Sequence, residues 1–209
     1  MQMAARKTLA VQFYNCGPAD VARELIGNLL CRQTRDGICV GRIVETEAYL
    51  AAGDPAAHSF GGPNRKNASM FGLPGRAYVY TIHARQCVNV VTEVEGMGSA
   101  VLIRAVEPLN GILLMQRRRR REHLRDLCRG PARLSEAFEI GRNLDGWDLT
   151  CGQRLWIAES PDDHELTISR SRRIGVTSAV EFELRFFVRD SKYVSGTRRQ
   201  NQSGDADQQ

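Results

Sequence analysis

The feature that most constrains the fold is a pair of β-strand patterns with almost nothing between them. Residues 77–82 read AYVYTI, residues 87–94 read CVNVVTEV, and only the four residues HARQ separate the two runs. Runs rich in Val, Ile, Thr and Tyr are typical of strands, and so short a connection joins antiparallel neighbours. The sequence therefore predicts a β-hairpin over residues 77–94, and with it an antiparallel sheet.

Further strand patterns are also joined by short connections, and β-branched and aromatic residues dominate them. The predicted strands cover residues 38–50 (two strands, after an Asp-Gly turn at 36–37), 99–109, 154–159, 173–176 and 184–190. Residues 51–76 are rich in Gly, Pro, Asn and Ser and are predicted to form a long loop. Loops of this length in compact domains usually carry function.

Three helices are predicted between the strands. The first begins at Pro18 and is expected to reach residue 32, because its apolar residues recur at helical spacing. The second is expected over about 109–128, and the third begins at the Gly-Pro pair 130–131. The predicted fold class is therefore α+β: a single mixed domain with a curved, mostly antiparallel sheet and flanking helices.

The length and composition fit one globular domain. A chain of 209 residues can bury about 70% of the surface that its unfolded form exposes. Its content of 42% hydrophobic and 25% charged residues is ordinary for a folded protein. We expect residues 1–8 to be an N-terminal tail and residues 9–195 to be the folded domain. Residues 196–209 are polar, lack an apolar pattern and are predicted to be a disordered C-terminal tail.

Arginine supplies 26 of the 29 basic residues, and the three lysines are Lys7, Lys66 and Lys192. With a net charge of +5 the chain suits an anionic partner, and guanidinium groups match phosphate oxygens, so nucleic acid is the leading candidate. A GC-rich genome also favours arginine, so the ratio alone decides nothing. The run Arg117–Arg121 is expected to be mainly a solvated helix face, with one or two members near phosphate, because five successive helical residues point around most of the cylinder and cannot all face one DNA backbone.

The six cysteines indicate neither a metal site nor a disulfide framework. They form no CxxC pair and have no histidine at zinc-finger spacing, so we expect reduced, mostly buried thiols, no metal and no other cofactor. A signal peptide and a run of 18 apolar residues are both missing from the sequence, so we expect no association with a membrane.

Residues 42–50, RIVETEAYL, alternate like a strand at the edge of the long loop. The alternation predicts Ile43, Glu45, Glu47 and Tyr49 on one face, and Val44 among the core residues of the other. A carboxylate beside an aromatic ring suits a general base next to a stacking surface. Two carboxylates two residues apart on a strand lie about 6.5 Å apart, as in inverting sugar hydrolases. A carbohydrate hydrolase and a solvated surface pair therefore both stay open.

Seven segments, in order, resemble one known family. They are ETEAYL (45–50), AAHS (56–59), MFGLPGRAYVY (70–80), CVNVVTE (87–93), LIRAVEPL (102–109), RGPARL (129–134) and LRFFVRD (184–190). Together they span about residues 9–195 and resemble the alkyladenine (3-methyladenine, methylpurine) DNA glycosylases. The resemblance implies a base excision repair enzyme that flips a damaged purine out of double-stranded DNA and hydrolyses its N-glycosidic bond, with a protruding hairpin for DNA.

The resemblance also implies catalytic roles. Glu47 matches the family's general base, which activates a water molecule for attack on the deoxyribose C1′. Arg104 matches the arginine that helps to hold this water, and the main-chain carbonyl of Ile174 matches the third ligand of the water. A buried carboxylate can accept the water's proton and stabilise the positive charge that develops on the sugar.

Four further residues match the family's base pocket. Tyr49 and His58 match the side chains that sandwich the extruded base, and Tyr80 matches the one that closes the pocket edge. Asn89 matches the asparagine that disfavours the exocyclic amino group of guanine. Stacking contributes about 1–3 kcal/mol per base, which offsets much of the few kcal/mol needed for extrusion.

The hairpin tip departs from the family pattern. The family places an aromatic wedge there, whereas this chain has His83 in a connection one residue shorter, so we expect His83 to be the wedge, with a solvated turn as the alternative. Arg76, beside the hairpin, and Arg133, near the start of the third helix, are the candidates for phosphate contacts. Met97 stands where many members have an acidic residue.

These observations predict a monofunctional glycosylase that releases alkylated or deaminated purines (3-methyladenine, 7-methylguanine, ethenoadenine, hypoxanthine) and leaves an abasic site. We expect no lyase activity, because that reaction uses an amine as nucleophile. Of the three lysines, only Lys66 lies among the matching segments, in the long loop 51–76. A lesion-binding protein with little catalysis stays open because of the altered tip. The expected form is a monomer, cytoplasmic and nucleoid-associated in a bacterium or nuclear in a eukaryote.

Overall fold

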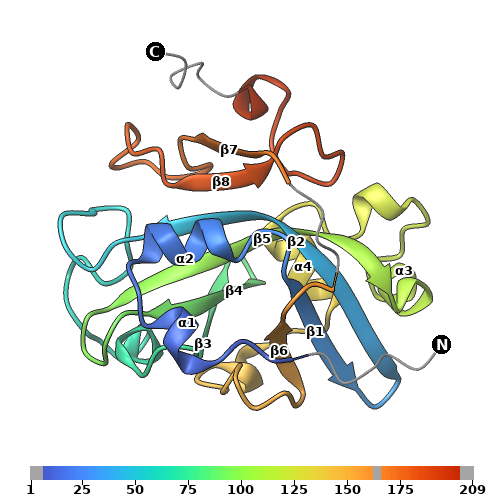
Figure 1. Ribbon diagram of the computed structural model, residues 1–209, viewed down its shortest axis with the longest axis horizontal. Helices are drawn as coiled ribbons and strands as arrows, with labels where there is room; N and C mark the ends of the chain where they lie inside the picture. The colour runs from blue at the N-terminus through green and yellow to red at the C-terminus, as the bar shows by residue number, and fades with distance from the viewer. Residues whose placement is uncertain (1–6, 162–165, 203–209) are drawn as a thin grey trace.

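The computed structural model describes residues 7–161 and 166–202 (Figure 1). A curled sheet forms its centre. The strands are β1 (Leu29–Thr34), β2 (Gly37–Tyr49), β3 (Ala77–Ile82), β4 (Arg85–Thr92), β5 (Ser99–Asn110), β6 (Leu155–Ala158), β7 (Ile168–Ser171) and β8 (Arg185–Val188). Six strands pair in the order β3-β4-β5-β2-β1-β6, and β8 pairs with β2 and β7. Every strand pair in the described ranges is antiparallel, so the predicted α+β class with a mostly antiparallel, curved sheet is confirmed.

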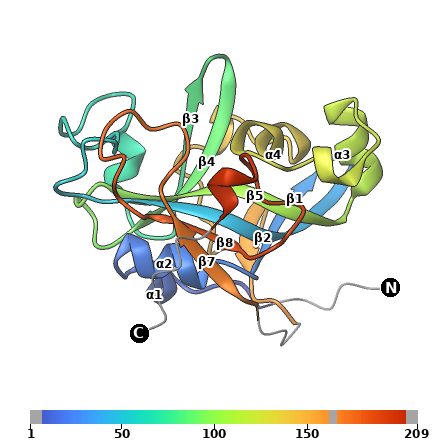
Figure 2. The same ribbon diagram turned by 90° about the horizontal axis from the view of Figure 1, so that it is seen from above.

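Short helices cover both sides of this sheet. They are α1 (Val11–Tyr14), α2 (Pro18–Glu24), α3 (Ile112–Arg119) and α4 (Pro131–Ala137), with 3₁₀ turns η1 (Ala68–Phe71), η2 (Leu124–Asp126), η3 (Arg142–Leu144) and η4 (Arg199–Asn201). Helices α1 and α2 lie on one side, whereas α3 and α4 lie on the other (Figure 2). The helix predicted to start at the Gly-Pro pair 130–131 is confirmed as α4.

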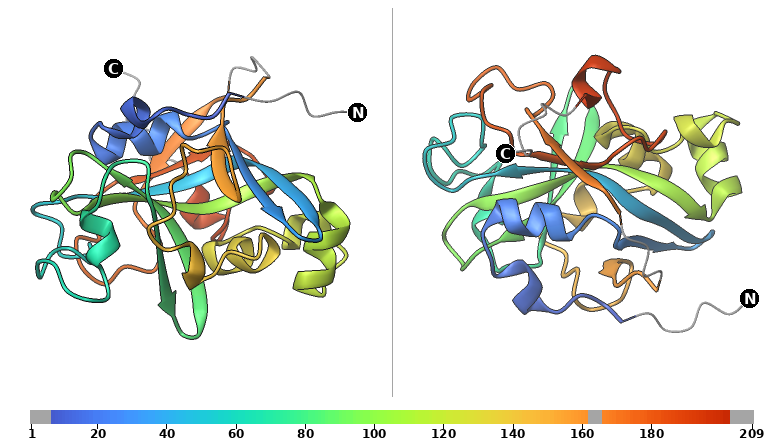
Figure 3. Two further views of the ribbon diagram at one scale, coloured as in Figure 1. Left: turned by 90° about the horizontal axis from the view of Figure 1, so that it is seen from below. Right: turned by 45° about the horizontal axis from the view of Figure 1, so that its top comes forward.

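The β3–β4 hairpin projects from the sheet on the side opposite α2 (Figures 2 and 3). Its turn consists of His83 and Ala84, whose φ angles are 46° and 59°. Positive φ at both central residues is the signature of a type I′ turn, whose twist matches that of the paired strands. The predicted hairpin is confirmed, but the four-residue connection is wrong, because Arg85 and Gln86 already belong to β4.

The helix predicted for residues 18–32 is wrong in its second half. Helix α2 ends at Glu24, and Leu29 and Leu30 begin β1, which pairs with β2. Both leucines are fully buried, and a short apolar run of this kind fits a buried strand as well as a helix. Residues 37–49 then form one long strand rather than two.

Three other predictions in the second half of the chain need correction. The helix predicted over 109–128 is only α3, because β5 continues to Asn110 and Arg120 takes a left-handed conformation with φ 51°. Residues 173–176 form a loop, and the strand lies earlier, at β7. Residues 196–202, expected to belong to a disordered tail, include the 3₁₀ turn η4, and Asn201 Oδ1 accepts a hydrogen bond from Arg185 at 2.8 Å. Residues 203–209 and residues 1–6 lie outside the described residues.

Two compensating β-bulges shape the middle of the sheet. Along the β2–β5 pair, Val44 is an extra residue on β2 and Arg104 is then an extra residue on β5. Because of the first bulge, Ile43 packs with Ala48 in the main core, whereas Val44 packs in a separate cluster with Tyr193. The prediction that Ile43 shares a face with Glu45 and Glu47 is therefore wrong.

The remaining composition-based expectations concern thiols and membranes. All six cysteines are free, and four of them are buried, as predicted. Within the described ranges, no helix combines the length and apolar character needed to cross a lipid bilayer.

Candidate active site

A fully buried carboxylate, Glu47, forms the centre of the site. It lies on β2 and accepts three hydrogen bonds. Tyr49 Oη and Arg104 Nη1 donate to Oε2 over 3.0 and 3.1 Å, and the backbone N of Ile174 donates to Oε1 over 2.7 Å. The structure thus brings together the three residues expected to be catalytic. The amide of Ile174 makes this contact, and the role expected for its carbonyl oxygen stays a prediction.

The second carboxylate of the motif, Glu45, is fully occupied by other partners. Arg104 Nε and Arg185 Nε donate to its Oε1 over 3.0 and 2.6 Å, and Ser195 donates through its backbone N (2.7 Å, to Oε2) and its hydroxyl (2.9 Å, to Oε1). Burial acts to raise the pKa of Glu45, but the two guanidinium groups and the Ser195 amide outweigh burial and lower the pKa. Glu45 is therefore a buried structural anion, unsuited to the role of general acid in sugar hydrolysis.

Arg104 connects the two carboxylates. Its Nε binds Glu45 while its Nη1 binds Glu47, so one guanidinium spans two side chains of the same strand. Burial acts to lower the pKa of Arg104, yet the charges of Glu47 and Glu45 outweigh burial and raise the pKa. The side chain starts from the bulge on β5, which accounts for its position between the two carboxylates.

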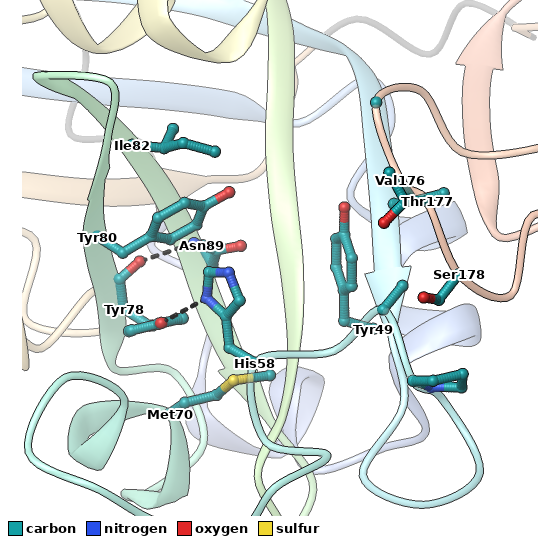
Figure 4. Close-up of a pocket in the computed structure, with 13 residues that line it drawn as sticks. Tyr49, His58, Met70, Tyr78, Tyr80, Ile82, Asn89, Val176, Thr177 and Ser178 are labelled. Atoms are coloured by element: carbon teal, nitrogen blue, oxygen red, sulfur yellow. Dashed lines mark hydrogen bonds between the residues drawn. The ribbon is translucent and has the colours of Figure 1, made fainter.

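A pocket of about 230 Å³ opens beside Tyr49, the hydrogen-bond donor to Glu47, between the end of β2, the β3–β4 hairpin and the loop 175–178 (Figure 4). A water molecule occupies roughly 30 Å³ of liquid, so the pocket can admit a ring system. Tyr49 stands on one side of the pocket, facing His58 and Tyr80 across the opening, and Asn89 lies behind them (Figure 4). All four residues expected to bind a base line this one pocket.

Tyr78, which the sequence reasoning missed, holds the His58 side of the pocket. The Tyr78 hydroxyl and His58 Nδ1 are 2.7 Å apart, and Asn89 Nδ2 donates to the Tyr78 carbonyl over 2.9 Å. Burial lowers the pKa of His58, and burial with the charge of Asp145 raises the pKa of Tyr78 to about 12. Both groups are therefore neutral near pH 7. Tyr78 could have been found from the strand alternation, because it lies on the same strand face as Tyr80.

A fully buried ion pair supports the wall formed by Tyr49. Arg173 Nη1 and Nη2 donate to the two carboxylate oxygens of Asp54 over 2.6 and 2.8 Å, and neither side chain has exposed surface. The Arg173 guanidinium also lies 4.7 Å from the centre of the Tyr49 ring. Because Ile174 follows Arg173, the pair fixes the loop that brings the Ile174 amide to Glu47. The sequence reasoning missed this pair, whose members are 119 residues apart.

The three residues expected to contact DNA do not lie together. His83 is exposed at the hairpin tip, and Ile82 beside it is 46% exposed and lines the pocket, an apolar partner that the sequence reasoning missed. Arg133 is exposed in the first turn of α4. Arg76 lies at the opposite end of β3 from the tip and pairs with Asp148 at 3.5 Å, a position that does not favour the expected phosphate contact.

The site contains no evident metal centre. Across residues 7–161 and 166–202, His, Cys, Asp and Glu side chains do not gather in groups of three or more that could hold a metal ion.

Comparison with known proteins decides the family. The family model of methylpurine-DNA glycosylase matches residues 12–192 of the sequence. The chain belongs to the methylpurine-DNA glycosylase family. A relative from Mesorhizobium japonicum is 49% identical over 181 residues, which cover 86% of each chain. A relative from Methanoculleus marisnigri is 44% identical over 191 residues, which cover 90% of this chain and 98% of the relative. Both carry the provisional name 3-methyladenine DNA glycosylase.

Membership in the methylpurine-DNA glycosylase family confirms the resemblance seen in the seven sequence segments. It makes the chain a DNA-binding hydrolase of DNA repair, so the reacting bond is an N-glycosidic bond of DNA. The carbohydrate hydrolase that the two glutamates left open is excluded by this membership and by the partners of Glu45.

Proposed function

We propose that this protein is a monofunctional DNA glycosylase that flips an alkylated or deaminated purine out of a duplex and hydrolyses its N-glycosidic bond. The expected bases are 3-methyladenine, 7-methylguanine, ethenoadenine and hypoxanthine, and the product is an abasic site. The observation that carries the proposal is the contact between the Tyr49 hydroxyl and Glu47, because it joins the wall of a ring-sized pocket to a buried carboxylate. The relatives' name, 3-methyladenine DNA glycosylase, supports this substrate class.

Glu47 is assigned the role of general base. An ionised carboxylate can accept about four hydrogen bonds, and Glu47 accepts three from protein groups in the described residues. Its remaining capacity suits a water molecule that attacks C1′ as the base departs, with Arg104 and the Ile174 carbonyl as the further ligands of that water. The negative charge of Glu47 stabilises the cationic sugar as the base departs, and Glu47 then accepts the proton of the attacking water.

The pocket walls are assigned the role of base recognition. Tyr49 on one side and His58 on the other can enclose a flat ring, with Tyr80 at the edge. Stacking on such side chains contributes about 1–3 kcal/mol per base and repays much of the energy of extrusion. Asn89 donates one of its two amide hydrogens to the Tyr78 carbonyl, so its second amide hydrogen and its amide oxygen are left for the pocket.

A nucleophilic amine is not part of the proposed reaction. Lys66 lies in a cleft beside the pocket, on the far side of His58 and Tyr80, and does not line the pocket itself. Lys7 pairs with Glu159 and Lys192 lies over the ring of Tyr193, and neither lines the pocket. We therefore assign hydrolysis without cleavage of the DNA backbone.

The test is base release from duplexes that each carry one of the four lesions, with the free base and the abasic product identified separately. The proposal expects release of at least one damaged purine, an intact backbone and no adduct after borohydride treatment. Tight binding to abasic or ethenoadenine DNA with no release would favour the lesion-binding alternative. A borohydride-trapped adduct that disappears in Lys66→Ala would overturn the monofunctional assignment.

A further inference from the structure

The arginine run 117–121 is divided by the end of helix α3. The helix ends at Arg119, and Arg120 takes a left-handed conformation with φ 51°. The side chains of Arg118 and Arg119 are only 13% and 10% exposed, whereas Arg117, Arg120 and Arg121 are exposed. The run is therefore not the solvated helix face that the sequence suggested. Two of its members point inward and three point outward.

The two inward arginines have acidic partners. Arg118 pairs with Glu139 at 2.8 Å and with Asp36 at 3.6 Å, and Arg119 pairs with Glu136. These contacts fix α3 against its neighbours and neutralise the two positive charges.

The three outward arginines, Arg117, Arg120 and Arg121, are here called the arginine turn. In the described part of the chain, no carboxylate forms an ion pair with any of them; Arg121 Nη1 donates only to the carbonyl of Arg120. Together with Gln116, Glu122 and His123 they line a shallow groove, and Glu122 is the one acidic residue of this lining. The turn thus carries three guanidinium groups without an ion-pair partner among the described residues, beside one carboxylate, a net positive surface that the catalytic site does not use.

The arginine turn lies on the same side of the molecule as the hairpin. Glu136 of α4 pairs with Arg119 of α3 and, at 3.6 Å, with Arg85 of β4, so α4 sits between the hairpin and α3. Figures 2 and 3 show α4 and α3 beside the projecting hairpin, on the face opposite α2.

The pocket and α4 occupy opposite faces of the hairpin. Tyr78 and Tyr80 face the pocket, whereas the alternate residues Val79 and Val88 pack in the main core with Phe138, next to α4. A duplex held at the hairpin tip, with one nucleotide in the pocket, would therefore pass over α4 toward the arginine turn.

We propose that the arginine turn is a second DNA-binding site that binds backbone phosphates of the duplex on the α4 side of the hairpin, away from the flipped nucleotide. The inference rests on the proposed function for the presence of a duplex at the hairpin. Phosphates fit because exposed guanidinium groups without carboxylate partners keep their full charge for phosphodiester oxygens. Contacts of this kind position the protein on DNA and carry no sequence information.

The test compares two triple variants that lose the same charge from opposite sides of the molecule. The first is Arg117→Gln, Arg120→Asn, Arg121→Gln; asparagine is chosen because it tolerates the left-handed conformation of residue 120. The control is Arg23→Gln, Arg170→Gln, Arg189→Gln, exposed positions on α2, on β7 and just after β8, on the side opposite the hairpin (Figure 2). Binding to a duplex with a central abasic-site analogue is measured over a range of salt concentrations, and thermal unfolding confirms that each variant is folded.

The slope of log K against log salt concentration is negative, and its magnitude should be smaller by about 2 to 3 in the first variant, because each phosphate contact contributes about 0.9. The affinity of this variant for the duplex near 0.1 M salt should be lower by about one-hundredfold. The control should match the wild type. Shortening the duplex on one side of the abasic analogue should remove the difference between wild type and the first variant, and shortening the other side should preserve it.

Equal salt slopes for the two triple variants would overturn the inference. So would a difference in affinity between wild type and the first variant that stays the same when the duplex is shortened on either side. The arginine turn would then be free for another partner, such as an acidic protein surface. The outcome is separate from that of the proposed function. Failure of the proposed function shows as absent base release by the wild type, whereas failure of this inference leaves base release intact.

Discussion

The hydroxyl of Tyr49 donates to Glu47 Oε2 over 3.0 Å, so the ring that forms one wall of the pocket is bonded directly to the buried carboxylate beside it. The two residues are separated by one position on β2 and share a strand face. Recognition of a base and activation of water therefore depend on one short segment of one strand.

Tyr49→Phe separates these two functions. Phenylalanine keeps the ring, so we expect nearly unchanged affinity for lesion-containing DNA. It removes the hydrogen bond to the carboxylate, and a hydrogen bond to a charged group is worth roughly 1.5–3 kcal/mol. We therefore expect a single-turnover rate about tenfold lower. Tyr49→Ala also removes the stacking surface and should weaken binding by about 1–3 kcal/mol. Equal losses of affinity in both variants would show that the ring does not stack on the base. Binding and single-turnover assays on the same duplex measure the two effects.

The buried pair Asp54–Arg173 should be strongly coupled. Removing one partner leaves a buried charge uncompensated, so we expect Asp54→Asn and Arg173→Met each to lower the free energy of unfolding by about 3–5 kcal/mol, and the double variant to lose much less than the sum. Urea unfolding of the four proteins measures the coupling. The exposed pair Lys7–Glu159 provides the control, because Glu159→Gln should change stability by less than about 1 kcal/mol. Additive losses at Asp54 and Arg173 would contradict the structure.

The stability of the protein should fall in acid through Glu45 and Asp54. Folding lowers the pKa of Glu45 below its ordinary 4.5 and that of Asp54 below 3.8, because the nearby arginines outweigh the effect of burial. A carboxylate whose pKa falls on folding stabilises the protein above its unfolded pKa, and this stabilisation disappears as the pH falls through the folded pKa. The free energy of unfolding should therefore decrease progressively below about pH 5.

Glu45→Gln tests this pH dependence. The variant should be less stable than the wild type at pH 7 but should lose less stability on acidification, whereas the exposed Glu95→Gln should follow the wild type. Urea unfolding at several pH values below neutral measures the difference. Parallel curves for wild type and Glu45→Gln would show that Glu45 is not linked to folding in this way.

The segment after Gly196 should contribute to stability. Arg185 donates to the Gln200 carbonyl over 3.0 Å and to Asn201 Oδ1 over 2.8 Å, so Asn201→Ala should lower the free energy of unfolding by about 1.5–3 kcal/mol, as expected for a hydrogen bond to a charged group. The exposed neighbour provides the control, since Gln202→Ala should leave stability unchanged. Equal stability of the two variants would support the disorder that the sequence suggested.

The parts of the fold that were predictable are those specified by local sequence. Alternation identified the hairpin 77–94 and placed Glu47 and Tyr49 on one strand face, and both features hold in the structure. The matching family segments supplied His58 and Asn89, which lie far from Tyr49 in sequence and line the same pocket.

The features that escaped prediction depend on pairing between distant segments. The bulges at Val44 and Arg104 arise where two strands about 60 residues apart set their register, and no local period reports a register shift. Leu29 and Leu30 were assigned to a helix because their spacing fits one, while their strand conformation comes from pairing with β2. The Asp54–Arg173 pair joins two loops that only the folded sheet brings together.

The most direct test of the account is the single-turnover rate of base release by Glu47→Gln on the best lesion duplex, with affinity for the same duplex measured in parallel. Glutamine keeps the size of the side chain but cannot accept the proton of the attacking water. We predict a rate lower by about 10² to 10⁴, the usual contribution of a general base, with binding retained. A rate equal to that of the wild type would contradict the assignment of Glu47 as the catalytic base.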